Sequence, residues 1–232
     1  VVVMLTSLLL SGSLVGSLIA PARDWMAQVP TSIARIEVAL RALRSPLKAA
    51  SQAGEQIAKL TNLRKLRIAW NPFEGFPEAV CKLEQLEELS GNGCQLSVLP
   101  SSFASLRNLL ELNLGDNAFE QFPEVICGMR SLRKLWLNGN KLSSLPQSFA
   151  NLRELRDLNI PYNRFKEFPL VLCELTNLVS LGMGSNQLSK LPRTITRLVH
   201  LETLNLSTNS FASFPLFLGD LLQLRYFPSY GM

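Results

Sequence analysis

The sequence contains very few of the side chains on which most active sites depend. His200 is the only histidine, and no GxxxxGK[ST] phosphate-binding loop occurs in the 232 residues. The cysteines also lack the CxxC spacing that is typical of zinc sites. We therefore expect no enzyme activity, no metal site and no cofactor, and we interpret His200 as a surface residue.

The amino-terminal quarter lacks other residue types. Phenylalanine and tyrosine are absent before Leu60, and residues 1–20 carry no charged side chain. A run of about 20 such residues is long enough to cross a bilayer as a helix, and Gly12 and Gly16 form a GxxxG pair that suits helix packing in membranes. We predict a transmembrane helix over residues 1–20. The alternatives are a secretory signal, although its basic start and cleavage site are not evident, or a buried soluble helix.

Residues 60–232 repeat themselves every 23 residues. Seven full copies share the pattern LxxLxxLxLxxNxΦxxΦPxxΦxx, and a partial eighth begins at Leu221. Apolar side chains two residues apart, such as Leu135 and Leu137, lie on one face of a strand. Because a single repeat cannot bury its apolar face alone, we expect the repeats to stack with their strands paired in parallel.

This pattern resembles that of the leucine-rich-repeat family, over about three quarters of the chain. The resemblance implies an α/β fold, a leucine-rich-repeat solenoid with a curved parallel sheet. One short strand per repeat would line the inner, concave face, and less regular or helical segments would lie outside. It also implies a role in protein–protein interaction.

Three further slots of the repeat have structural explanations. One slot after the strand can satisfy backbone groups through a buried amide, with Cys94 standing there in the second repeat; its other occupants are Asn71, Asn117, Asn140, Asn163, Asn186 and Asn209. A proline that starts the return segment follows in every repeat. Phenylalanine and leucine alternate around the turn with a period of 46 residues, which indicates volume compensation in a dense core.

Residues 21–59 connect the apolar run to the repeats. Apolar residues at spacings of three and four predict helices over residues 31–44 and 46–59, with a break at Ser45-Pro46. These helices could cap the first repeat, whose apolar edge is otherwise exposed. The segment also resembles part of the autoinducer-exporter family of transporters, on the residues Pro21, Trp25, Pro30, Leu40, Leu43 and Pro46. That resemblance implies a fragment or fusion of a polytopic transporter with an appended repeat tail.

Charge and cysteine content bear on the compartment. Residues 1–59 hold six Lys or Arg against three Asp or Glu, and positive charge beside a span tends to stay cytoplasmic. We expect a membrane-anchored protein with cytoplasmic repeats, or otherwise a cytoplasmic one, and no nucleic-acid partner.

Cys81, Cys127 and Cys173 are about 10 Å apart in successive pairs, beyond disulfide reach, so we interpret all four cysteines as reduced core residues. Because residue 1 is Val, we expect a fragment or a processed form.

The residues that flank the buried strand leucines must point outward on the inner face. Trp136 occupies an outward slot that the pattern does not require to be apolar, and exposed Trp, Tyr and Arg dominate protein interfaces. The alternative is that Trp136 packs on the stems of neighbouring Lys and Asn side chains. We predict a site for a protein or peptide partner at Arg67, Trp70, Glu111, Asp116, Lys134, Trp136, Asp157 and Tyr162. A third interpretation makes the repeats the sensing arm of a larger signalling enzyme.

Overall fold

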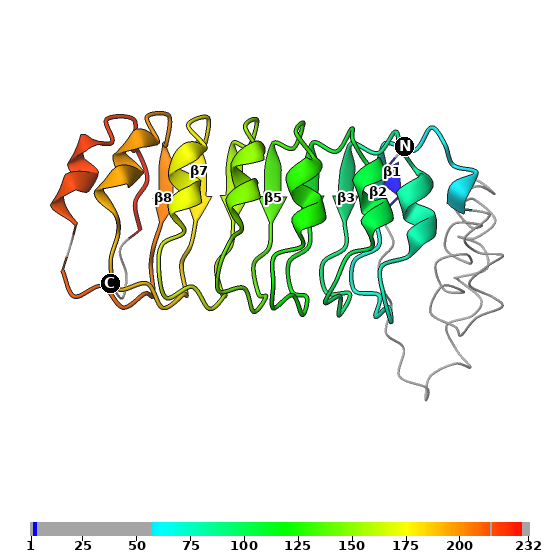
Figure 1. The fold of residues 1–232 in the computed structure, drawn as a ribbon, viewed down its shortest axis with the longest axis horizontal. Coiled ribbons are helices and arrows are strands. Elements are labelled where there is room, and N and C mark those ends of the chain that lie inside the picture. The colour runs from blue at the N-terminus through cyan, green and yellow to red at the C-terminus, as the bar shows by residue number, and fades with distance from the viewer. Residues whose placement is uncertain (1, 4–56, 214, 229–232) are drawn as a thin grey trace, which may run out of the picture.

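A computed structural model describes residues 2–3, 57–213 and 215–228 of the protein. These residues form a solenoid on one parallel sheet of eight strands, which lie side by side in sequence order (Figure 1). The strands are β1 (Val2–Val3), β2 (Lys65–Arg67), β3 (Glu88–Ser90), β4 (Glu111–Asn113), β5 (Lys134–Trp136), β6 (Asp157–Asn159), β7 (Ser180–Gly182) and β8 (Thr203–Asn205). A 3-10 helix follows each strand from β2 on, and these helices are η1 (Glu78–Lys82), η2 (Ser101–Ser105), η3 (Glu124–Gly128), η4 (Gln147–Asn151), η5 (Leu170–Glu174), η6 (Arg193–Arg197) and η7 (Leu216–Asp220).

The strand register confirms the 23-residue period. From β2 to β8 every paired residue lies 23 positions after its partner, as in Leu112 with Leu135 and Leu135 with Leu158. The partial eighth repeat continues this register, because Tyr226 forms a parallel bridge with Thr203. The seven full repeats and the partial eighth predicted from the sequence are therefore present as one continuous stack.

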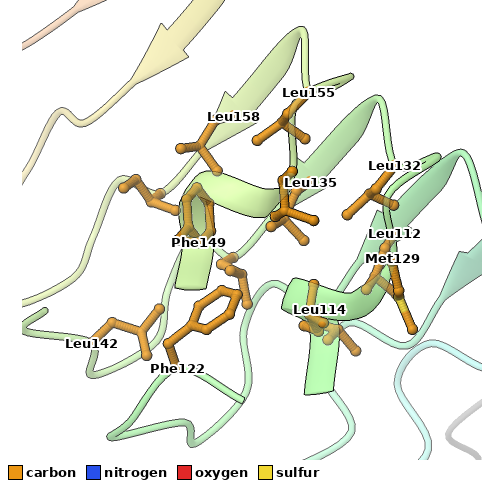
Figure 2. Packing of buried hydrophobic residues seen from close by; sticks show 14 of the residues in the cluster. Leu112, Leu114, Phe122, Met129, Leu132, Leu135, Leu142, Phe149, Leu155 and Leu158 are labelled. Carbon is orange, nitrogen blue, oxygen red and sulfur yellow. The ribbon is translucent and has the colours of Figure 1, made fainter. Parts of the chain in front are cut away.

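The core is a row of buried leucines, one from each of the strands β2–β8, with phenylalanines packed between neighbouring repeats. Leu112, Leu135 and Leu158 are fully buried, and Figure 2 shows them in a row under the neighbouring strands. Phe122 packs edge-to-face against Phe149 of the next repeat, with ring centroids 5.1 Å apart, and Phe76 packs in the same way against Phe103 at 4.9 Å. The alternation of large and small side chains thus places one aromatic pair across each of these odd–even junctions.

The turn geometry that the repeats share depends on the asparagine slot. The side-chain amide of Asn117 donates to the carbonyl oxygens of Leu114 and Gly91, and its Oδ1 accepts from the backbone N–H groups of Cys94 and Leu96. One side chain therefore satisfies backbone groups in its own repeat and in the preceding one. At Cys94 the thiol donates to the carbonyl oxygen of Ile68, which lies 3.1 Å from Sγ.

The outer side is built from short helices. The residue before each 3-10 helix is a proline in extended conformation, as the sequence predicted for the start of the return segment. Proline lacks the N–H that a continuing strand would need, and its fixed φ suits entry into a helical turn.

The amino-terminal segment differs from the sequence prediction where the structure describes it. Val2 and Val3 form strand β1, which pairs in parallel with β2, and not the first turn of a transmembrane helix. Without β1, the backbone groups at the outer edge of β2 would be unpaired, and β-branched valines suit a strand that pairs with them. Residues 4–20, the connector, the predicted helix over 31–44 and most of that over 46–59 lie outside the described residues. None of the helices in the described part has the length and apolar character that a bilayer span requires.

Candidate binding surface

The solvent-exposed side of strands β2–β8, opposite to the short helices, is the surface on which the sequence predicts the binding site, and we call it the strand face. In each strand the middle residue is buried, and from β3 to β6 the first and third residues are both half-exposed. Because side chains alternate along a strand, a buried leucine spine forces these flanking residues outward. The strand face therefore carries two columns of side chains, one from the first and one from the third strand position.

The first column is a row of charges. Lys65 pairs with Glu88, and Nζ of Lys134 lies 2.7 Å from Oε1 of Glu111. The hydrogen bond from Lys134 to Glu111 raises the pKa of the lysine ammonium. Asp157 follows in register with Lys134 on β6. Beyond it, on β7 and β8, the column continues with neutral residues.

Asp157 is the acidic group in this row with a perturbed pKa. Burial raises the pKa of its carboxyl, and the nearby Glu111 adds to this increase. The positive charge of Lys134 and a hydrogen bond from Ser180 act in the opposite direction. A carboxylate that is held half-desolvated between a lysine and a serine can accept hydrogen bonds from a ligand.

Trp136 is the third residue of β5, in register with Asn113 on β4 and Asn159 on β6. Its side chain is half-buried, in contrast to the large apolar residues that the structure leaves exposed. Trp136 therefore has flat polar neighbours on both sides and offers part of its surface to the solvent.

A third column lies in the turn directly after each strand. At this slot every full repeat has a positive φ, including the bulky Trp70 (58°), Asp116 (54°) and Tyr162 (54°). Trp70 is 57 % exposed and Tyr162 is 68 % exposed. The left-handed region is unfavourable for such residues and costs about 1–3 kcal/mol at each position. Two large aromatic rings are thus held in the solvent by a strained backbone at the border of the strand face.

The same slot alternates between large and small residues. The second and fourth repeats have glycine there, with φ of 67° at Gly93 and 63° at Gly139. A Cβ at Gly139 would come within 2.3 Å of Oδ1 of Asp116, so the Asp116 side chain occupies the space above this glycine. The predicted site omitted both glycines, although aligning the repeats at this slot shows the alternation.

The structure brings together only part of the predicted site. Glu111, Lys134, Asp157 and Trp136 lie on the three adjacent strands β4, β5 and β6, and Asp116 and Tyr162 lie in the turns after β4 and β6. Arg67 and Trp70 belong to the first repeat, three strand steps from β5, or roughly 14 Å. They form a separate part of the strand face.

Reactive groups are buried away from this surface. Cys81, Cys94, Cys127 and Cys173 are all buried, as predicted. Burial raises the pKa of Cys81, Cys127 and Cys173, so these thiols stay neutral. No group of three or more metal-ligating side chains converges within the described residues.

A polar groove of about 810 Å³ lies along the turns that lead out of the strands, and it is lined by Glu120, Gln121, Lys141, Ser143, Arg164, Lys166, Glu167 and Gln187.

Comparison with known proteins assigns the family. The family model described as "Leucine-rich repeat region" matches residues 38–168, more than half of the chain. The chain belongs to the leucine-rich-repeat family. A search of curated proteins gave no significant match.

Several solved leucine-rich-repeat structures share the fold. The internalin InlF of Listeria monocytogenes has 25 % identity and a TM-score of 0.67, over 76 % of this chain and 51 % of its own. The internalin InlC2 of the same species has 24 % identity and a TM-score of 0.66, over 75 % and 74 %. The plant peptide hormone receptor RGFR1, in complex with RGF2, has 22 % identity and a TM-score of 0.58, over 75 % and 33 %. The chain thus spans about half the length of InlF.

Proposed function

We propose that the strand face binds a protein or peptide partner around β4, β5 and β6. The observation that carries this proposal is the exposure of Tyr162 in a left-handed turn, one repeat after the half-buried Trp136 and the Lys134 that pairs with Glu111. Aromatic anchors surrounded by polar groups are typical of interface hot spots. Backbone strain of this kind also concentrates at ligand-binding positions.

The chemistry of the row favours a ligand with hydrogen-bond donors or positive charge. Asp157 and Asp116 are acidic side chains in the repeats on either side of that of Trp136, and neither forms an ion pair with a lysine or arginine within the described residues. A basic or N–H-rich segment lying across β4–β6 would supply partners to both carboxylates while its apolar side chains contact Trp136 and Tyr162. The fold is also that of a plant receptor for a peptide hormone, which is in line with a peptide ligand.

A comparative pull-down with the full chain tests the proposal. The wild type is compared with the double variant Trp136→Ala, Tyr162→Ala and with the control Leu170→Ala. Leu170 is 64 % exposed and lies in the same repeat as Tyr162, but on η5 at the outer side. We expect a partner whose recovery falls at least about 30-fold with the double variant, the size of a hot-spot effect, and is unchanged with the control. Equal recovery with all three proteins would remove the strand face as the binding surface.

We also propose that residues 4–20, the charge-free run after strand β1, tether the protein to a membrane, with the repeats on the cytoplasmic side. The support is the charge-free sequence of this run and the basic residues that follow it. Extraction of membranes with alkaline carbonate separates the possibilities. A tethered protein stays in the pellet and a variant without residues 4–20 moves to the supernatant, whereas release of the full chain by carbonate would contradict the tether.

A further inference from the structure

The turns that lead from each 3-10 helix into the next strand carry a cluster of arginines in repeats three to five. Arg107, Arg130 and Arg153 occupy one slot in three successive repeats, and Arg133 and Arg156 lie three residues after the latter two. We call this row of turns the arginine edge. All five side chains are exposed. The only acidic residue in the turns 107–110, 130–133 and 153–156 is Glu154.

None of the five arginines forms an ion pair within the described residues. Six other basic residues there do, namely Arg64, Lys65, Lys134, Lys141, Arg193 and Arg225. The concentration is local, because residues 60–232 as a whole hold 17 Lys or Arg against 15 Asp or Glu. The arginine edge is therefore a patch of uncompensated positive charge on a nearly neutral solenoid.

Exposed apolar side chains continue the same edge. The slot of Arg107, Arg130 and Arg153 is occupied by Val199 and Leu222 in the last two repeats, and these are 57 % and 89 % exposed. An acidic protein segment would form ion pairs with the arginines, but it would not cover the exposed aliphatic side chains of Val199 and Leu222, which lie in line with them. A bilayer surface uses both, since anionic headgroups attract arginine and the interface takes up exposed aliphatic groups.

The shape of the edge also fits a bilayer. In the view of Figure 1, the turns that lead into the strands end at a similar height along the solenoid, so that many of them can reach one surface together. We propose that this edge docks on an anionic bilayer, with the five arginines at the lipid phosphates and with Val199 and Leu222 in the interface. Docking in this way leaves the strand face standing away from the membrane and open to a partner. The proposal does not depend on the identity of that partner or on the tether.

Vesicle binding of the full chain tests the proposal. The probes are vesicles of phosphatidylcholine alone and of phosphatidylcholine with roughly 30 % phosphatidylserine, because each basic side chain near an anionic surface strengthens binding about fivefold. The test variant is Arg130→Gln, Arg153→Gln. The control is Arg164→Gln, Lys166→Gln, which removes the same charge from exposed residues of the polar groove at the other edge.

We expect the test variant to bind anionic vesicles roughly 25-fold more weakly than the wild type, and the control to change less than about threefold. The variant Arg130→Lys, Arg153→Lys should retain most of the binding. An equal loss in test and control variants would show that net charge alone acts, and no loss in either would overturn docking through this edge. Binding of an oligo-glutamate peptide that depends on Arg130 and Arg153, without binding to anionic vesicles, would assign the edge to an acidic protein instead.

Hydrogen exchange keeps the test decisive if residues 4–20 hold the protein on both kinds of vesicle. On anionic vesicles, the amides of 107–110, 130–133 and 153–156 should exchange more slowly than on neutral ones, while those of 141–144 and 164–167 should not change. Unaltered exchange in the first set of turns would overturn the proposal regardless of how the amino terminus behaves.

Discussion

The indole of Trp70 lies directly over Gly93 of the following repeat, so that a Cβ on Gly93 would be 2.3 Å from Cε3 of Trp70. Gly93 also has a φ of 67°. Two residues away, Gly91 occupies the buried slot directly after the strand, which leucine, isoleucine or methionine fills in the other repeats, and a Cβ there would meet Leu114 at an ordinary 3.5 Å. The same short segment thus contains one glycine that the structure requires and one that it merely tolerates.

These two glycines should respond oppositely to the same substitution. Gly93→Ala places a side chain in the left-handed region against the Trp70 ring, and should lower the free energy of unfolding by about 1–3 kcal/mol. Gly91→Ala should leave it unchanged or raise it by up to about 1 kcal/mol, because alanine has less backbone freedom in the unfolded chain. Urea unfolding of the two variants measures both effects. A loss at Gly91 as large as that at Gly93 would contradict the packing described here.

The asparagine slot predicts a second contrast. Asn117→Ala leaves the N–H groups of Cys94 and Leu96 without the Oδ1 that accepts from both, and should lower the free energy of unfolding by about 2–4 kcal/mol. Cys94→Ala removes a weak thiol donor, so its cost should be clearly smaller. Thermal and urea unfolding of both variants provide the comparison, and equal costs would show that the amide does not connect the repeats.

The edge-to-face ring pair gives a test of the 46-residue period. Leucine substitutions at Phe122 and Phe149 should show a coupling free energy of about 0.5–1.5 kcal/mol in a double-mutant cycle. The matched cycle uses Phe168 and Ile195, which occupy the equivalent slots 46 residues later and contain a single ring. Its coupling should be smaller. Equal coupling in the two cycles would mean that the aromatic pair adds nothing beyond ordinary apolar contact.

Much of this fold was predictable because the same apolar and polar residues recur at the same positions in every repeat. A leucine slot that recurs every 23 residues can be buried in each copy only if the copies stack in register, so Leu112, Leu135 and Leu158 together determine the sheet. The asparagine slot was predictable for the same reason, since each turn exposes the same backbone groups. The placement of Glu111, Lys134 and Asp157 on adjacent strands follows directly from that register.

Other features depend on contacts between particular neighbours. The left-handed φ of Trp70 and the position of its ring over Gly93 are contacts between two neighbouring repeats, which the pattern of one repeat does not predict. The raised pKa of Asp157 likewise arises from burial that the pattern of one repeat does not predict. Strand β1 could not be predicted, because Val2 and Val3 pair with an edge more than sixty residues away in the sequence. The half-burial of Trp136 depends likewise on its strand neighbours.

Asp157 predicts a pH dependence. Its folded-state pKa is raised, mainly by burial, so the charged form is less favourable in the folded than in the unfolded chain. The contribution of Asp157 to stability is therefore complete below the ordinary carboxyl pKa and is lost as the pH rises through the raised folded value. Asp157→Asn should be more stable than the wild type at pH 7, and this advantage should shrink toward pH 4. Urea unfolding at both values measures the difference, and an advantage that grows on acidification would contradict the sign.

Photo-cross-linking tests the central claim, that the partner binds the strand face, most directly. The photoreactive residue p-benzoylphenylalanine is placed at the position of Tyr162 in one protein and of Leu170 in another, because these positions are similarly exposed on opposite sides of one repeat. We expect a specific cross-linked partner from position 162 and none from position 170. The same cross-linked partner from position 170, with none from position 162, would place the binding surface on the outer helices and contradict the account.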